Sequence, residues 1–510
     1  MRKLLRLLVA VSVSAAATQA QANWYEAKSN HFVIWADESP NQLKLYAQNL
    51  ERFDSAARQL MGLSDPPLTD AGRVNIFVLP SLGAVSKLAG ASWVGGLYVS
   101  RADGSFAFVP DLNILSSDYS RVIFFHEYTH HLQLQNADYP VPEWVAEGFA
   151  DFMSTAEVNS DGSMTFGKQA PGREWSPMQQ SMLPLNQLVG ESYGKLNDRM
   201  IDYLYARGWL LTNYLLGEPK RRNEISSYVN AIAKGAKPID AAQSAFGDLN
   251  KLERDLENYA NSNSLHGFKV GADIIRVGPV ALRPLTPGEV AIMDVRVHSK
   301  RSVDEKTAPI VAAEAAKVAQ QFPNDAFVQS CVAEAEFDAK DYAAAEAAAD
   351  KALAANPNDI HALIYKGRIE MALAAAKPGK AADWDGIRDW FLKANKLDTE
   401  NAEPLELYYE SYGAAHQPPT PNAVDALVYA MTLAPQDEQV RMNATMALLA
   451  EGKAADARKA FALIGYQPHL APQTREWADK VMQAIDSGDT KGALTLIASF
   501  KPAPEADKKK

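Results

Sequence analysis

The chain has little cysteine and, beyond its first residues, no long apolar run. These two shortages exclude some classes of protein. Cys331 is the only cysteine among 510 residues, which excludes an intrachain disulfide. No later stretch reaches the roughly 20 apolar residues that a membrane-spanning helix needs. The rest of the composition, 47% hydrophobic and 22% charged, is that of a globular protein. A chain of this length predicts two or more domains.

Residues 1–22 have the pattern of a secretory signal peptide. Arg2, Lys3 and Arg6 precede an apolar run that ends in Ala-Gln-Ala, the small-residue pattern of a cleavage site. Loss of these three positive charges takes the formal net charge from −11 to −14. An acidic exported protein is a poor candidate for nucleic-acid binding. We therefore expect a soluble protein in a bacterial periplasm or secreted, with no nucleic-acid partner and no membrane span.

Residues 23–265 mix strand and helix patterns. The stretches HFVIWA (31–36) and RVNIFVLP (73–80) are rich in β-branched and aromatic residues and predict strands. Apolar residues at helical spacing lie between them, over 41–63. A hairpin is predicted over 95–110, turning at Ala102-Asp103-Gly104. This order of elements indicates an α+β domain.

A proline-containing segment and an alanine-rich region follow. Residues 266–307, with Pro279, Pro284 and Pro287, indicate a connector with short strands. Residues 308–500 are alanine-rich and predict helices, and residues 501–510 form a charged tail.

Four segments of the alanine-rich region repeat one another: 341–359, 383–401, 421–437 and 453–468. Ala352, Ala394 and Ala430 fall at equivalent places, and Pro357 and Pro435 close two of the units. The pattern resembles tetratricopeptide repeats, in which small residues let paired helices pack closely. An irregular all-helical domain is the alternative, since the period is not strict. Stacked helical hairpins present a concave surface, so the resemblance implies a protein partner.

The stretch SRVIFFHEYTHHLQLQ (120–135) carries the strongest chemical pattern. His126 and His130 are four residues apart, so on a helix their imidazoles share one face and can reach one metal ion. Glu127 is placed to take a proton from a water on that metal. His131 points about 100° away from His130 and is expected to be a capped or surface histidine.

A third ligand is expected on a following helix, PEWVAEGFADF (142–152). Glu143, Glu147 and Asp151 are successively four residues apart and share a face. At this point the sequence resembles the gluzincin metallopeptidases, whose pattern is His-Glu-x-x-His followed by a glutamate in a context such as Glu-Gly-x-Ala. The resemblance implies that Glu147 is the third zinc ligand and that Asp151 supports His126. Glu143 remains a rival ligand.

A tyrosine on a later helix is a candidate donor to the developing oxyanion. In DYLYARGWLLTNYLL (202–216) Tyr205, followed by Arg207 and Gly208, resembles the tyrosine-containing helix of gluzincin aminopeptidases. Tyr203 and Tyr193 are competitors. By analogy, the strand SFAFVP (105–110) is expected to be the edge strand that pairs with an extended substrate.

The sequence therefore predicts an α+β gluzincin-like metallopeptidase domain followed by an all-α tetratricopeptide-like helical repeat domain. In the leading hypothesis one Zn²⁺ ion is held by His126, His130 and Glu147, Glu127 is the general base, and the repeats recruit a peptide or protein substrate. The Gly-x-Met-Glu-Asn segment of aminopeptidases is absent from the sequence, so aminopeptidase activity is not predicted. The alternative is a catalytically silent exported scaffold that acts through its repeats.

Overall fold

A computed structural model describes most of the chain. The described residues are 24–91, 94–110, 118–135, 141–169, 182–191, 198–262, 265, 267–377, 382–465 and 472–500. The signal-peptide prediction, the charged tail and Tyr193 lie outside these residues. Within them, no helix has both the length and the apolar character needed to cross a membrane.

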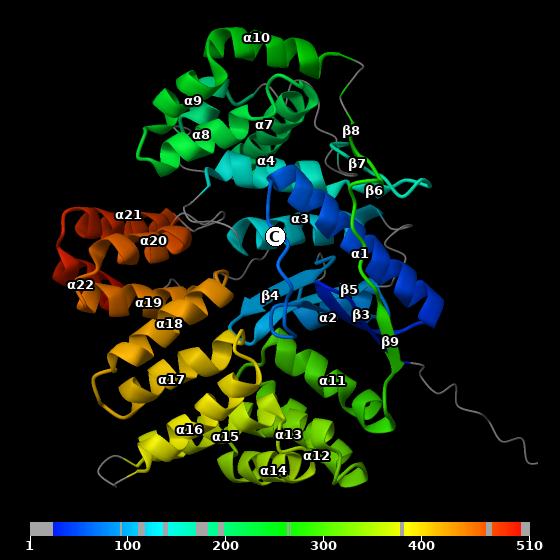
Figure 1. The fold of residues 1–510 in the computed structure, drawn as a ribbon, viewed down its shortest axis with the longest axis vertical. Helices are drawn as coiled ribbons and strands as arrows, with labels where there is room; N and C mark the ends of the chain where they lie inside the picture. The colour runs from blue at the N-terminus through cyan, green and yellow to red at the C-terminus, as the bar shows by residue number, and fades with distance from the viewer. Residues whose placement is uncertain are drawn as a thin grey trace, which may run out of the picture.

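A mixed six-stranded sheet organises the first domain (Figure 1). Its order is β4-β5-β3-β2-β1-β9, with β2, β3 and β5 parallel and the other neighbours antiparallel. The strands are β1 (Trp24–Lys28), β2 (Phe32–Asp37), β3 (Val74–Leu79), β4 (Leu97–Arg101), β5 (Gly104–Pro110) and β9 (Ala281–Pro284). The predicted strands and hairpin are confirmed. The expectation that SFAFVP is an edge strand is wrong, because β5 pairs on both sides and β4 forms the edge.

Each face of this sheet packs against a different set of helices. Successive side chains of a strand point to opposite faces, and here Ile34 and Ile76 join one apolar cluster while Trp35 and Phe77 join another. The first cluster includes α1 (Pro40–Met61) and α3 (Asp118–Gln135). The second includes α2 (Leu82–Ala89). The sheet is thus buried on both sides, and the histidine helix α3 lies on one defined face.

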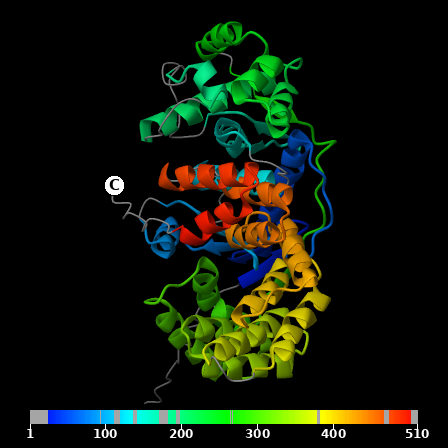
Figure 2. The same cartoon turned by 90° about the vertical axis from the view of Figure 1, so that its left-hand side faces the viewer.

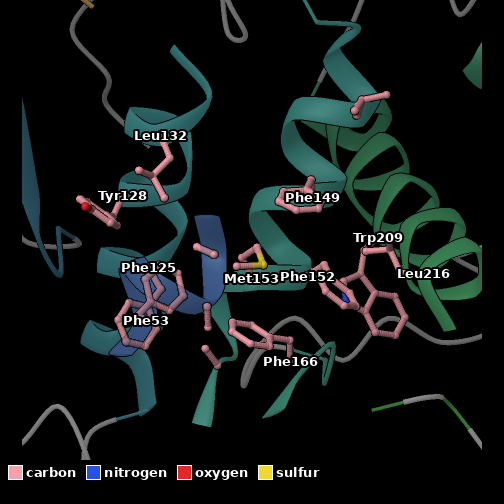
Figure 3. Close-up of a cluster of buried hydrophobic side chains, with 14 of the residues drawn as sticks. Phe53, Phe125, Tyr128, Leu132, Phe149, Phe152, Met153, Phe166, Trp209 and Leu216 are labelled. Atoms are coloured by element: carbon pink, nitrogen blue, oxygen red, sulfur yellow. The ribbon is translucent and has the colours of Figure 1, made fainter. Parts of the chain in front are cut away.

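The helices and the small sheet on the α3 side complete the first domain. They are α4 (Glu143–Ser154), α6 (Leu185–Val189), α7 (Asp198–Gly217), α8 (Glu224–Ala233), α9 (Pro238–Phe246), α10 (Leu249–Ala260) and the strands β6 (Glu157–Val158), β7 (Met164–Phe166) and β8 (Phe268–Val270). Figure 3 shows part of the core they share: Met153 and Phe152 of α4 lie between Phe125 of α3 and Trp209 of α7, with Phe53 of α1 and Phe166 of β7 beneath them. Phe53 and Phe125 stack with ring centroids 3.9 Å apart.

The predicted connector contains a helix that the sequence pattern did not indicate. Short strands are present, since β8 and β9 lie in it, but α11 (Pro287–Arg301) follows them. Thr286 caps α11 by accepting from the Glu289 amide, and the Glu289 carboxylate accepts from the Thr286 amide in return. Such a capping box, with proline at the first position, is a strong start signal. The segment is therefore a structured bridge.

Paired helices make up the rest of the chain. They are α12 (Ala308–Gln321), α13 (Ala326–Asp338), α14 (Tyr342–Ala355), α15 (Ile360–Ala375), α16 (Trp384–Leu397), α17 (Ala402–Ala414), α18 (Pro421–Leu433), α19 (Glu438–Ala450), α20 (Ala454–Gly465), α21 (Pro472–Asp486) and α22 (Thr490–Ser499). Consecutive helices pack against each other along the series. This is a tetratricopeptide-like helical repeat architecture.

Helix caps recur through the repeats and mark their period. The side chains of Asp325, Asp359, Asn401 and Asp437 cap α13, α15, α17 and α19. These caps are 34, 42 and 36 residues apart, against about 34 in tetratricopeptide repeats. The second interval contains the insertion near residue 380. The alanines predicted to be equivalent, Ala352, Ala394 and Ala430, are each 0% exposed, so their small side chains lie in the contact between helices.

The repeats curve back toward the first domain. In Figures 1 and 2 they run from α12 at one end of the molecule up to α20–α22, which lie at the level of α3. The tip of the β4–β5 hairpin contacts them: Ala102 belongs to an apolar cluster with Leu405 and Leu427. Gln436 donates to Ser105 at 3.2 Å. The two domains therefore share an interface close to the histidine helix.

Candidate metal centre

The helix α3 is anchored on its apolar side, which fixes where its histidines point. Phe124, Phe125 and Tyr128 are at most 4% exposed and pack in the core beneath the sheet. Thr129 donates its hydroxyl to the Phe125 carbonyl at 2.7 Å. His126 and His130 lie on the other side of the helix and face α4.

Three predicted ligands converge between α3 and α4. His126 Nε2 lies 3.1 Å from His130 Nε2 and 3.3 Å from Glu147 Oε2. His130 Nε2 lies 3.5 Å from Glu147 Oε1. Glu147 is 0% exposed. The structure thus brings together the two imidazoles and the carboxylate that the sequence pattern selected.

The spacing of these donor atoms fits one tetrahedral metal ion. Zinc binds nitrogen and carboxylate oxygen at about 2.0–2.2 Å, so two ligands at a tetrahedral angle are separated by roughly 3.3 Å. The three separations observed here bracket that value. Two imidazoles and one carboxylate form a donor set that suits zinc and leaves a fourth position for water or substrate. The residues present therefore fit the metal.

Each imidazole is oriented by an acceptor on its far nitrogen. His126 Nδ1 lies 3.0 Å from Asp151 Oδ1, and His130 Nδ1 lies 3.0 Å from Gln133 Oε1. Because these oxygens accept, each Nδ1 carries the proton and each Nε2 keeps its lone pair for a metal. Gln133 also donates to the Ala146 carbonyl on α4 at 3.3 Å. Sequence reasoning missed Gln133, although its place one turn after His130 was a usable signal.

The charges around His126 favour a cation. Burial lowers the pKa of His126, but the carboxylates of Asp151 and Glu147 outweigh burial and raise it to about 10. The carboxylates thus impose a strongly negative potential on the imidazoles. A divalent cation held between His126, His130 and Glu147 would neutralise that charge.

A glycine contact holds α4 at the required position. A Cβ on Gly148 would lie 2.3 Å from the Gly208 carbonyl carbon, and a Cβ on Gly208 would lie 2.7 Å from the Trp144 carbonyl oxygen. No side chain fits at either position, so the backbones of α4 and α7 touch there. Because Gly148 follows Glu147 directly, this contact sets the depth at which the carboxylate enters the site.

The rival ligand and the third histidine lie elsewhere. Glu143 Oε2 is 3.5 Å from a guanidinium nitrogen of Arg475 on α21 of the repeats, so Glu143 faces the other domain. His131 is 4% exposed and its Nδ1 lies 2.6 Å from the Tyr98 hydroxyl. Burial lowers the pKa of His131 to about 3, which keeps the ring neutral. The expectation that His131 lies at the surface is wrong, because its ring is buried.

Tyr205 lies beside the site. Its ring stacks on His126 with centroids 6.2 Å apart and an interplanar angle of 16°, and the residue is 9% exposed. Arg207 forms a buried ion pair with Glu253 of α10. Tyr203 is half-buried on the same helix and packs against the core of the first domain. These contacts place Tyr205, but they do not assign a role to its hydroxyl.

Glu127 and His130 face a cavity of about 800 Å³. The first domain contributes Tyr98 and Ser100 of β4 to its wall, and the repeats contribute Glu406 of α17. A volume of this size is typical of sites that enclose small organic ligands or a few peptide residues. A substrate in the cavity would therefore contact both domains.

A second polar cluster lies behind α3. His31 Nδ1 is 2.9 Å from Glu51 Oε2, and His31 Nε2 is 2.9 Å from Asp65 Oδ1. Arg58 binds both oxygens of Asp54, at 3.0 and 2.9 Å. Both ring nitrogens of His31 already contact carboxylates and an arginine neutralises Asp54, so the cluster is a buried ion-pair network. Tyr128 of α3 donates to Asp54 at 2.7 Å and connects the network to the histidine helix.

Comparison with known proteins gives no match to a protein-family model and none to a curated protein. Several solved structures match by fold. PilF of Pseudomonas aeruginosa is 14% identical, with a TM-score of 0.32, over 41% of this chain and 88% of that one. A thermophilic TPR protein of Thermus thermophilus is 11% identical, with a TM-score of 0.31, over 37% and 95%. Yeast Tom70 is 13% identical, with a TM-score of 0.26, over 90% and 85%. These scores are low, so the matches carry no argument about function.

Proposed function

We propose that this protein combines a helical-repeat scaffold for protein or peptide partners with a zinc-dependent centre that hydrolyses peptide bonds. The scaffold has the broader support, because the tetratricopeptide-like architecture is a feature of the fold itself and such arrays commonly bind proteins. In this respect the observations favour the alternative hypothesis, a scaffold, over the peptidase hypothesis. Nothing in the comparisons points to hydrolysis or to the gluzincin family. The hydrolase proposal rests on the site alone.

One observation carries the hydrolase proposal. The donor atoms of His126, His130 and Glu147 lie 3.1–3.5 Å apart at the edge of the shared cavity. When bound, a zinc ion supplies a Lewis acid and lowers the pKa of its water to about 7. Asp151 and Gln133 keep the two imidazoles in the tautomer that such binding requires.

Three residues of the chain would then have separate roles in the reaction. Glu127 follows His126 directly and faces the cavity, so its carboxylate can take a proton from a water there and pass it to the leaving amine. Tyr205, stacked on His126, is the candidate donor to the developing oxyanion. Glu147 is buried and acts as ligand and counter-charge rather than as base.

The experiment measures bound zinc and cleavage of a mixed peptide library for the wild type and for Glu127→Gln. The proposal expects one zinc in both proteins and cleavage by the wild type alone, because the substitution removes the base and keeps the ligands. Stoichiometric zinc without wild-type cleavage would leave the scaffold as the function. Absence of zinc would overturn the site assignment.

A further inference from the structure

The cavity at the metal centre is lined by acidic side chains, most of which belong to the repeats. Seven carboxylates and two arginines line it. Both arginines are already paired, Arg101 with Asp103 at 3.3 Å and Arg368 with Glu403 at 3.2 Å. The remaining carboxylates give the cavity an excess of negative charge. Low-dielectric walls strengthen such a field inside a cleft.

Glu406 on α17 is the most unusual group of this wall. It is 8% exposed, and among the described residues no lysine, arginine or histidine lies within ion-pair distance of it. The Asn443 amide donates to Glu406 Oε1 at 3.4 Å, and the same amide donates to Glu410 Oε1 at 3.1 Å. One amide thus bridges two carboxylates one helical turn apart. A buried carboxylate normally has a cationic partner.

The titration of Glu406 agrees with a missing counter-charge. Burial raises its pKa first, Glu410, Asp437 and Glu403 raise it further, and Arg368 lowers it in part. The result is a pKa of about 8. A cation between Glu406 and Glu410 would lower this pKa again, because the cation favours the ionised form of the Glu406 carboxyl.

We infer that the shared cavity binds a basic peptide segment, with a lysine or arginine side chain held between Glu406 and Glu410 while the peptide backbone passes Glu127 and His130. This inference names the substrate class of the proposed hydrolase and rests on that proposal for catalysis, although binding does not depend on it. The two domains have separate tasks in it. The repeats select the side chain and the first domain positions the bond to be cleaved.

The test uses the Glu127→Gln chain, so that a bound peptide stays uncleaved whether or not zinc is present. Isothermal titration compares an alanine-rich hexapeptide containing one arginine with the same peptide containing citrulline, which keeps the shape and removes the charge. We expect the arginine peptide to bind about 10- to 100-fold more tightly, the range for charge-assisted hydrogen bonds. Equal binding of the two peptides overturns the inference and needs no further variant.

Added substitutions locate the effect. Glu406→Gln and Glu410→Gln, singly and together, are expected to weaken the arginine peptide toward the citrulline value and to leave the citrulline peptide unchanged. Glu314→Gln is the matched control, since Glu314 is exposed on α12 and does not line the cavity. Arginine preference that survives the double substitution overturns the assignment of these residues. Arginine preference together with no wild-type cleavage supports the binding site while removing the hydrolase proposal.

Discussion

Both regions of the chain bring helices together through small residues, but they do so with different consequences. In the repeats, Ala352, Ala394 and Ala430 occupy the same place in successive units and are all fully buried. In the first domain, the Gly148–Gly208 contact joins one particular pair of helices. The repeated alanines produce a regular array, whereas the glycine pair sets a single distance next to Glu147.

Buried charge separates the two regions as well. Behind the histidine helix, His31, Glu51 and Asp54 form a network in which carboxylates face cations. On the cavity side of the repeats, Glu406 is buried, and no cationic side chain of the described residues lies within ion-pair distance of it. Removing one partner from a matched network leaves a buried charge unpaired and destabilises the fold, while a carboxylate buried without a partner indicates a place for a ligand. Three substitutions, each with a control, test the differences between the two regions.

The largest effect is expected for the buried ligand. Glu147→Ala removes the carboxylate between the two imidazoles, so we expect the zinc content measured by mass spectrometry to fall from one ion per chain to near zero at neutral pH. Glu143→Ala is the control one helical turn away, because Glu143 contacts Arg475 of the repeats and lies outside the group of three ligands. Loss of zinc in Glu143→Ala with retention in Glu147→Ala would reverse the ligand assignment.

The second effect concerns the matched network and depends on pH. Burial alone would lower the pKa of His31, but the hydrogen bond with Glu51 and the charges of Asp54 and Glu51 raise it above 6.5. The stability this raised pKa contributes is fully present below pH 6.5 and is lost as the pH rises through the folded-state pKa. His31→Gln is therefore expected to lower the free energy of unfolding by about 3–5 kcal/mol at pH 6 and by less at pH 9.

Denaturant unfolding at the two pH values measures the difference. An exposed ion pair provides the control: Lys340 of the repeats and Glu305 of the connector are 66% and 88% exposed. Solvent screens their attraction, so Lys340→Gln is expected to leave the free energy of unfolding nearly unchanged. A loss for His31→Gln that does not change between pH 6 and pH 9 would contradict the protonated state of His31.

The smallest effect compares one glycine from each region. Gly148→Ala places a methyl group 2.3 Å from the Gly208 backbone and is expected to destabilise by about 1–3 kcal/mol, with weaker zinc binding as Glu147 shifts. Gly413→Ala on α17 meets nothing within 4 Å. There the substitution is expected to be neutral or to stabilise by up to about 1 kcal/mol, since alanine favours helix. Thermal melts of both variants measure these changes, and equal melting temperatures would show that the α4–α7 contact adapts.

Local patterns were enough to predict the elements of the fold and several residues of the site. Runs of β-branched and aromatic residues predicted β2 and β3, the turn at Ala102-Asp103-Gly104 predicted the hairpin, and four-residue spacing placed His126 and His130 on one face. The choice between Glu147 and Glu143 came from family resemblance, and in the structure it is Glu147 that meets the histidines. Its physical basis is the close approach of α4 and α7, which depends on Gly208, sixty residues away.

What could not be predicted depended on long-range contacts. The strand β5 was expected at the edge of the sheet, but nothing local shows that β3 pairs with it. The acidic wall was missed because Glu406 lines the same cavity as Glu127 and His130 only when the repeats curve back across the first domain. Gln133 was missed for a different reason: its place one turn after His130 is a local signal, but its contact with Ala146 of α4 is not.

The tip of the β4–β5 hairpin couples the unfolding of the two domains. Lys300 binds Asp103 of that tip and Glu334 of α13, both at 2.9 Å. Ala102 packs among apolar side chains of the repeats. Separating the two domains would expose these charged groups and this apolar surface together. The two domains distinguished in the sequence are therefore not expected to unfold independently. The chain is expected to melt as one cooperative unit, and its cavity to exist only in the intact molecule.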